Sequence, residues 1–211
     1  MKITDNVLLY DIDESKLSPL RQEIQNVLDK PNNYNQANQH LAGNLEKEYH
    51  LSQDTRNHLN DILMECINDY VEYHSDIHPN YLNSVDYCDR DYPMRLTDAW
   101  VNFQKKYEFN PVHRHTGLFS FVLWLQVPYT IEEEINGPHC VNSNYAAAGH
   151  FEIIYSTNCG EIITTKLPVD KTYEGKLLLF PSHMNHCVYP FYTSDEYRIS
   201  VSGNIKICPH G

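Results

Sequence analysis

The first third of the chain contains two stretches whose apolar residues recur every three or four positions, which is typical of a helix buried along one side. The first stretch begins at Ser15 or Ser18 and is stopped by Pro31. The second follows the capping candidates Ser52 to Thr55 and runs to His78-Pro79. We expect these two helices to pack on the outside of a sheet.

From Met94 onwards the pattern changes to short runs of alternating or continuous apolar residues with turn residues between them. Closely spaced strands without helical segments between them argue against a parallel sheet and favour a sandwich or jelly roll. Another short strand is expected near the start of the chain. The predicted strands are Ile3 to Tyr10, Leu96 to Tyr107, Leu118 to Val127, Gly149 to Ser156, Glu161 to Leu167, Lys176 to Phe180, Cys187 to Phe191 and Tyr197 to Ile207.

We expect one domain over residues 1–211, with residues 1–92 as a helical and loop support and residues 93–208 as the β core. Asn32 to His50 is rich in Asn and Gln and shows little periodicity, so we expect a long loop that could close over a site or meet a partner. Tyr129 to Ala148 is expected to be an excursion between strands, with its run of glutamates on a solvated face.

The chain is acidic, with 28 Asp and Glu residues against 16 Lys and Arg and a formal charge of −12. This charge repels phosphate backbones, so a nucleic-acid substrate is disfavoured. The six cysteines include no C-x-x-C pair and are expected to be free thiols. No apolar window is long enough for a membrane span and the start of the chain does not resemble a signal peptide, so we expect a cytoplasmic protein.

The first candidate for chemistry is the pair His113 and His115, which precedes the apolar run Leu118 to Val127. Side chains alternate along a strand, so residues at odd positions share one face. The odd positions after the two histidines are Gly117, Phe119, Phe121, Leu123 and Leu125. If this row faces the interior of a barrel, both imidazoles point inward at its open end and form a metal-binding pair.

A third imidazole follows the buried-strand run Lys176 to Phe180 and the turn at Pro181-Ser182. We prefer His186 as this ligand because it begins the next strand, whereas its rival His183 lies in the turn. Three ligands on one side of a metal leave its other positions open for a co-substrate and dioxygen.

The last predicted strand has polar residues at the even positions Arg198, Ser200, Ser202 and Asn204, so one polar row faces a cavity or solvent. The planar arginine fork binds a carboxylate through two hydrogen bonds, and a neighbouring hydroxyl adds another. On the strand before the histidine pair, Asn102 and Gln104 share parity and could line the same cavity, while Trp100 and Trp124 are expected to be packing residues.

From Trp100 to Ile207 the sequence resembles the iron(II)- and 2-oxoglutarate-dependent dioxygenase superfamily, most closely its prolyl-hydroxylase-like branch, which includes many tailed-phage proteins. This resemblance implies a double-stranded β-helix, a jelly-roll or cupin-like fold, with flanking helices. It is carried by Asn102-Phe103-Gln104, Asn110-Pro111-Val112-His113-Arg114-His115-Thr116-Gly117, Gly175 to Ser182, His186 and Arg198-Ile199-Ser200.

The resemblance also implies the roles of individual residues. In the family an H-x-D/E pair and a distal histidine bind iron, and an arginine with a hydroxyl residue two positions later binds the far carboxylate of 2-oxoglutarate. By position, His113 matches the proximal histidine and His186 the distal one. Arg198 and Ser200 match the co-substrate anchor, and Asn102 and Gln104 add polar contacts.

One position departs from the family pattern, because His115 stands where the carboxylate is usual. Either His113, His115 and His186 bind iron together, or His115 is the first ligand and Gly117 leaves the acid position to water. Both versions keep His115 and His186.

The resemblance implies an enzyme that hydroxylates a substrate with Fe(II) and 2-oxoglutarate. A peptidyl side chain, prolyl first, is the expected target, so a peptide or protein is a possible partner beside the small co-substrate. If the chain is phage-encoded, the host cytoplasm is expected. Rivals are a cupin-like module that holds a metal without turnover and a three-histidine dioxygenase that does not use 2-oxoglutarate.

Overall fold

The computed structural model describes residues 1–4, 6–75, 94–157 and 159–208. In these residues the helices are α1 Glu14–Asp29, α2 Gln53–Ser75 and α3 Ile131–Asn136. The strands found there are β1 Lys2–Thr4, β2 Val7–Asp11, β3 Lys47–His50, β4 Met94–Gln104, β5 Asn110–His113, β6 Phe119–Gln126, β7 Phe151–Ser156, β8 Ile162–Leu167, β9 Lys176–Pro181, β10 Asn185–Val188 and β11 Arg198–Ile207.

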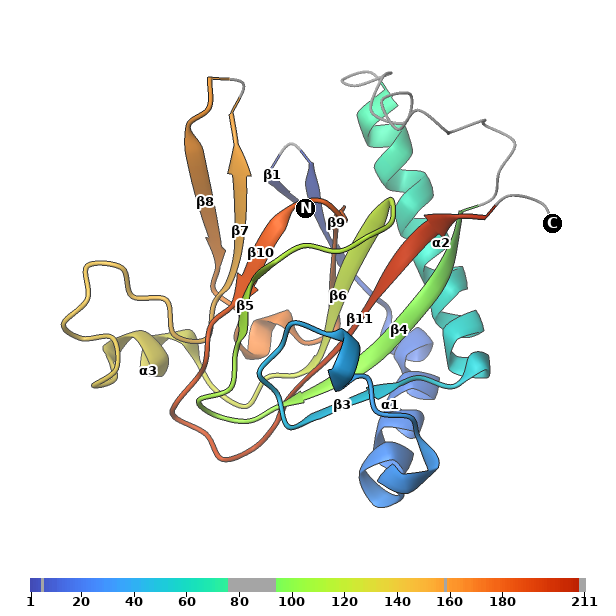
Figure 1. Ribbon diagram of the computed structural model, residues 1–211, viewed down its shortest axis with the longest axis horizontal. Helices are drawn as coiled ribbons and strands as arrows, with labels where there is room; N and C mark the ends of the chain where they lie inside the picture. The colour runs from blue at the N-terminus through green and yellow to red at the C-terminus, as the bar shows by residue number, and fades with distance from the viewer. Residues whose placement is uncertain (5, 76–93, 158, 209–211) are drawn as a thin grey trace.

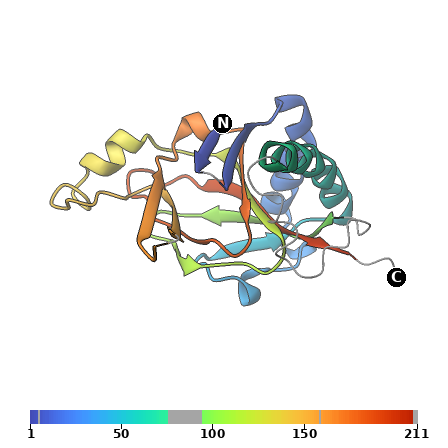
Figure 2. The ribbon, with the colours of Figure 1, turned by 90° about the horizontal axis from the view of Figure 1, so that it is seen from above.

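Among the described residues the strands form two antiparallel sheets. The larger has the order β1-β2-β9-β6-β11-β4-β3 and the smaller the order β5-β10-β7-β8. Helices α1 and α2 and the smaller sheet lie on opposite sides of the larger sheet (Figure 1, Figure 2). The expected mainly-β architecture with helices packed outside the sheet is therefore confirmed.

Each side of the larger sheet has its own apolar core. One core joins α1 and α2 to the sheet and includes Leu17, Leu20, Leu59, Leu63, Phe119, Phe121 and Leu123. The other lies between the two sheets and includes Val122, Trp124, Phe151, Phe180 and Phe191. The even positions of β6 therefore pack into the core between the sheets, and the odd ones pack into the core beside the helices.

The prediction that the odd row of β6 faces the interior between the sheets was wrong. Phe119, for example, packs against Tyr70 of α2, with ring centroids 4.9 Å apart. The alternation is broken because β5 and β6 belong to different sheets. The chain turns between them at Gly117, whose φ is +118°, so the parity of the histidines does not continue into the apolar run.

Helix α1 begins at Glu14, one residue before the earlier of the two predicted starts, since Asp13 rather than a serine caps it by accepting a hydrogen bond from the Ser15 amide. It ends before Pro31, as predicted. At the start of α2 the Ser52 hydroxyl accepts from the Thr55 amide at 3.3 Å. The predicted end of this helix at His78-Pro79 and the following polar linker lie outside the described residues. No helix in the described part of the chain is long and apolar enough to cross a membrane.

The predicted loop from Asn32 to His50 contains a strand, since β3 pairs with β4 at the edge of the larger sheet. The sequence Lys-Glu-Tyr-His is too short and too polar to show strand alternation. The glutamate run begins α3, where Thr130 and Glu133 form a capping box; Glu132 and Glu133 are exposed as predicted, whereas Glu134 is buried. Its carboxylate accepts hydrogen bonds from the Tyr192 and Thr193 amides, both at 2.8 Å.

Two other boundaries were misjudged. The leading strand is a hairpin of β1 and β2, and β10 begins at Asn185 instead of Cys187. Strand β5 was not predicted as a separate element, yet it positions the site because it pairs with β10 and sets His113 directly opposite His186.

Candidate metal centre

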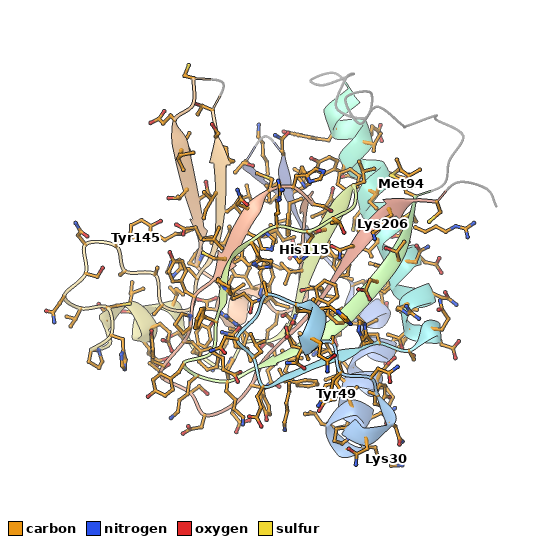
Figure 3. The ribbon with its side chains drawn as sticks, in the orientation of Figure 1. Lys30, Tyr49, Met94, His115, Tyr145 and Lys206 are labelled. Atoms are coloured by element: carbon orange, nitrogen blue, oxygen red, sulfur yellow. The ribbon has the colours of Figure 1, made fainter. Side chains whose placement is uncertain are left out.

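Three histidines from two segments converge between the sheets. In the pair β5 and β10, the rings of His113 and His186 lie with centroids 4.2 Å apart, and the His115 ring is 5.0 Å from each. The His115 amide donates to the Ser182 carbonyl at 2.9 Å, which connects the segment after β5 to the residue that follows β9. His115 lies toward the middle of the molecule in Figure 3. One nitrogen from each imidazole lies within 4.8 Å of the other two.

Hydrogen bonds within the two segments orient two of the rings. The Nδ1 atom of His113 lies 2.7 Å from the Pro111 carbonyl, and that of His186 lies 3.0 Å from the Met184 carbonyl. A carbonyl can only accept, so each Nδ1 carries the proton and each Nε2 keeps its lone pair. This is the arrangement that fixes a histidine as a metal ligand through Nε2.

Burial also keeps the three imidazoles neutral. It lowers the pKa of His113 and, with the charge of His113 as a second cause, lowers the pKa of His115 to about 4. Burial lowers the pKa of His186 well below its usual value, and His113 again adds to the effect. Neutral imidazoles are the form that binds metal, and imidazole nitrogen suits iron. The donor set therefore fits an Fe(II) ion.

The structure bears on two choices that the sequence left open. One is whether His186 or His183 is the third histidine, and the other concerns Gly117 at the acid position. His183 is exposed, whereas His186 is only 3% exposed and stacks on Phe151. A side chain at Gly117 would meet the Ile205 carbonyl at 2.8 Å and the Ser182 hydroxyl at 3.4 Å. The arrangement favours His186 over His183 and leaves no ready space for a side chain at position 117.

The three rings open into a small cavity between the sheets, with a volume of about 40 Å³. A single water molecule needs roughly 10–15 Å³, so the cavity has room for only a few. The structure brings all seven predicted site residues together around it. They are His113, His115, His186, Asn102, Gln104, Arg198 and Ser200.

The polar wall comes from neighbouring strands in register. Arg198 of β11 lies opposite Gln104 of β4, and Ser200 lies opposite Asn102. The Asn102 amide nitrogen is 3.2 Å from the Ser200 hydroxyl oxygen. Trp100 and Trp124 are both buried as expected and also line the cavity.

Arg198 is 3% exposed, and all its hydrogen-bond acceptors in the described residues are uncharged. Its Nε and Nη2 atoms donate to Gln104 Oε1 at 3.2 and 2.6 Å. Nη1 donates to the Tyr129 hydroxyl at 2.5 Å and to the Gly149 carbonyl at 3.0 Å, and Nη2 donates to the Tyr189 carbonyl at 3.1 Å. A buried cation without an anionic partner fits a bound carboxylate.

Sequence reasoning missed two residues of this site. Tyr129, which is 1% exposed, contacts Arg198 from the far side of the guanidinium, and Leu45 lines the cavity from the segment before β3. Nothing in the local pattern marks either residue, because each reaches the site through contacts with segments distant in the sequence.

Comparison with known proteins agrees with this geometry. The model of the family described as "Putative 2OG-Fe(II) oxygenase" matches residues 98–204, half of the chain. No curated protein matches the chain.

Among solved structures, a prolyl-4-hydroxylase from Pseudomonas putida is similar, with a TM-score of 0.53, 12% identity and coverage of 96% of this chain and 93% of that one. So is a prolyl hydroxylase from Trichoplax adhaerens in complex with a peptide fragment of hypoxia inducible factor, with a TM-score of 0.53, 11% identity and coverage of 96% and 83%. AviO1 from Streptomyces viridochromogenes Tue57 is also similar, with a TM-score of 0.51, 12% identity and coverage of 99% of this chain and 92% of that one. At these identities the likeness shows the fold, a double-stranded β-helix.

Proposed function

Because the chain belongs to the 2OG-Fe(II) oxygenase family, an enzyme family that uses Fe(II) and 2-oxoglutarate, we propose that His113, His115 and His186 hold the iron and that the enzyme hydroxylates a C–H bond. The observation that carries this proposal is the buried Arg198 guanidinium, which lines the same cavity as the three histidines and has only uncharged partners in the described chain. A metal site without turnover has no use for such a cation.

When bound, Fe(II) and 2-oxoglutarate supply the oxidising chemistry, in which dioxygen is reduced as the keto acid is converted to succinate and carbon dioxide. The chain supplies position and exclusion of water. Nε2 of His113 and of His186 would hold the ion, because Nδ1 of each donates to a backbone carbonyl. Trp100, Trp124 and Phe151 form apolar walls that keep water from the reacting groups.

The guanidinium of Arg198 binds the far carboxylate of 2-oxoglutarate, and the Ser200 hydroxyl donates a further hydrogen bond. Gln104 Oε1 now accepts from both Nε and Nη2, the pair of nitrogens that a carboxylate would use. The co-substrate therefore displaces the Gln104 amide from the arginine fork. That movement also enlarges a cavity that at about 40 Å³ is far smaller than a 2-oxoglutarate site must be.

A peptidyl side chain, with proline as the first choice, is the proposed substrate class. The support is the similarity to two prolyl hydroxylases, one of them solved with a peptide. The formal charge of −12 also favours a peptide over a nucleic acid.

The test is succinate release from 2-oxoglutarate by the chain reconstituted with Fe(II) under controlled oxygen, first without a substrate. We expect slow uncoupled turnover in the wild type and its loss in Arg198→Ala, while Arg95→Ala, an exposed arginine on β4, behaves as the wild type. Circular dichroism and Co(II) binding check that each variant is folded, and the milder Ser200→Ala should raise the KM for 2-oxoglutarate.

A wild-type chain that binds iron and releases no succinate would contradict the proposal. That outcome would favour a three-histidine dioxygenase that uses O2 alone, or a cupin-like module that only holds a metal.

A further inference from the structure

Four buried oxygen atoms near the candidate site have no hydrogen-bond partner in the described residues. They are both carboxylate oxygens of Glu48, Oδ1 of Asn102 and Oδ1 of Asn110. Glu48 is 0% exposed and Asn102 is 6% exposed. An unpaired buried acceptor costs about 1–3 kcal/mol, and more when it carries a charge, so a group of four calls for a donor that the chain does not supply.

Asn102 and Asn110 line the cavity, and the strand pairing places Glu48 next to Asn102. Glu48 of β3 lies directly opposite Asn102 of β4, so the two side chains share a face of the sheet, and Asn102 lines the cavity. Asn110, at the start of β5, lines it as well. Asn110 Oδ1 and Glu48 Oε1 both lie next to Gly43: a Cβ added at Gly43 would be 2.7 Å from the first and 3.2 Å from the second. The two acceptors are therefore in the same small region.

The cations of the neighbouring surface are engaged elsewhere. Lys105 pairs with Glu46 at 2.6 Å, and Lys47 donates to the Tyr197 hydroxyl at 3.2 Å. Arg198, on the same wall, donates to Gln104 and to other uncharged oxygens. Burial, with the charge of Glu108 as the second cause, raises the pKa of Glu48 to about 7, as expected for a carboxylate that lacks a cation.

We propose that Glu48, with Asn102 and Asn110, binds a cationic nitrogen group of the substrate, an ammonium or a guanidinium, beside the iron. These groups are donors only, with three and five N–H bonds, and so match the four unpaired acceptors. A hydroxyl or an amide would bring its own acceptor and leave the carboxylate charge uncompensated. The inference deepens the proposed function, on which it rests, by giving the substrate a basic group within reach of the oxidised carbon.

The test uses the full chain loaded with Co(II) and 2-oxoglutarate and two probes of nearly equal shape, Nα-acetyl-lysine methylamide and its neutral analogue with a methyl group in place of the ε-ammonium. Calorimetry should show the lysine probe binding at least about tenfold more tightly, the preference expected from a hydrogen bond to a charged group. In the Fe(II) enzyme the same probe should stimulate succinate release. An arginine probe extends the comparison to a guanidinium.

In Glu48→Gln the preference for the charged probe should disappear, while the affinities for Co(II) and 2-oxoglutarate stay unchanged. Glu46→Gln, two residues earlier on the exposed carboxylate that pairs with Lys105, is the matched control and should keep the preference. Asn110→Asp should increase the preference, which provides a second test if Glu48→Gln does not fold.

Equal binding of the two probes by the wild type, or a preference that survives in Glu48→Gln, would overturn the inference. Either result would mean that the acceptors satisfy one another, through a protonated Glu48 or a reversed Asn110 amide. Failure of the proposed function would give a different result: the wild type would neither bind 2-oxoglutarate nor release succinate with any probe.

Discussion

At the scale of single residues, the three histidines are held to different degrees. His113 and His186 each have a backbone carbonyl on Nδ1, whereas His115 is fixed through its own amide and by the rings around it, including Trp100 at 5.8 Å between centroids. His115 also stands where the family usually has a carboxylate. It is therefore the proposed ligand whose substitution would be most informative about the metal.

We expect His115→Asp to keep one equivalent of Fe(II) or Co(II), since two imidazoles and a carboxylate also form a three-ligand face. His115→Ala should bind the metal at least about tenfold more weakly, because a ligand is lost and not replaced. Metal content and Co(II) absorption spectra measure both. Exposed His183 gives the control His183→Ala, and equal metal binding by all four proteins would exclude His115 as a ligand.

Glu48 gives a prediction for stability against pH. Its pKa is about 7 in the folded chain and about 4.3 in an unfolded one, so the unfolded state loses this proton first as the pH rises. The free energy of unfolding should therefore fall between about pH 4.5 and pH 7, by up to about 3 kcal/mol from this residue.

Urea unfolding at pH 5 and pH 8 measures the effect. Glu48→Gln has no proton to lose, so its stability relative to the wild type should be higher at pH 8 than at pH 5. Glu46→Gln, which changes an exposed carboxylate, should show no such difference. A pH-independent effect of Glu48→Gln would contradict the raised pKa.

Residue types that carry chemistry could be identified from the sequence. The histidines, Arg198 and Ser200 recur at the spacing of a known family, and Asn102 and Gln104 followed from strand parity. Glu48, Tyr129 and Leu45 could not be found in this way. Their roles depend on pairing between segments that lie far apart in the chain, and a single sequence does not display that pairing.

At the scale of elements, the turn between β5 and β6 decides where the histidines point. The sequence correctly predicted a strand after the pair, but the interior-facing row was wrong because parity was carried across Gly117. The chain changes sheets there, between β5 and β6, and Gly117 in that turn has a positive φ.

We expect Gly117→Ala to lower stability by about 2–4 kcal/mol, because its φ of +118° and a contact of 2.8 Å with the Ile205 carbonyl both oppose a side chain. Gly160→Ala is a matched control. Its φ is +81°, yet an added Cβ would meet no atom within 4 Å, so a loss of about 1 kcal/mol is expected. Thermal unfolding compares the two, and equal losses would show that the contact at position 117 is relieved.

Helix α3 depends on a buried carboxylate. Glu134 accepts from the Tyr192 and Thr193 amides, so Glu134→Ala leaves two backbone donors unpaired and should cost about 3 kcal/mol. Hydrogen exchange at those two amides should accelerate. Glu132→Ala, on the exposed side of the same helix, should leave both amides protected.

At the scale of the whole molecule, the sequence predicted the mainly-β class and the outer helices, since both follow from periodicity. It did not predict that β1, β2 and β3, from the part expected to support the core, would join its larger sheet. A strand was predicted near the start of the chain but not its place in the sheet, and β3, with four residues, carries too few alternating positions to be recognised.

Metal and co-substrate bind the folded chain and not the unfolded one, so together they should raise its thermal stability. At a hundred times the dissociation constant the gain is about 2.7 kcal/mol. The melting temperature should be measured with Co(II) alone and then with Co(II) and 2-oxoglutarate. Arg198→Ala should keep the increase caused by Co(II) and lose the further increase caused by 2-oxoglutarate. An unchanged melting temperature with both present would contradict binding at this site.

The strand register that sets His113 opposite His186 has a consequence for the connectivity of the chain. An ion held by both residues acts as a cross-link that closes a loop of roughly seventy residues, and in the entropic account used for disulfides a loop of that size is worth about 4 kcal/mol. The loop contains β6, β7, β8 and β9, which are strands of both sheets. An iron ion bound by His113 and His186 would therefore also restrain the ends of the segment that carries these four strands.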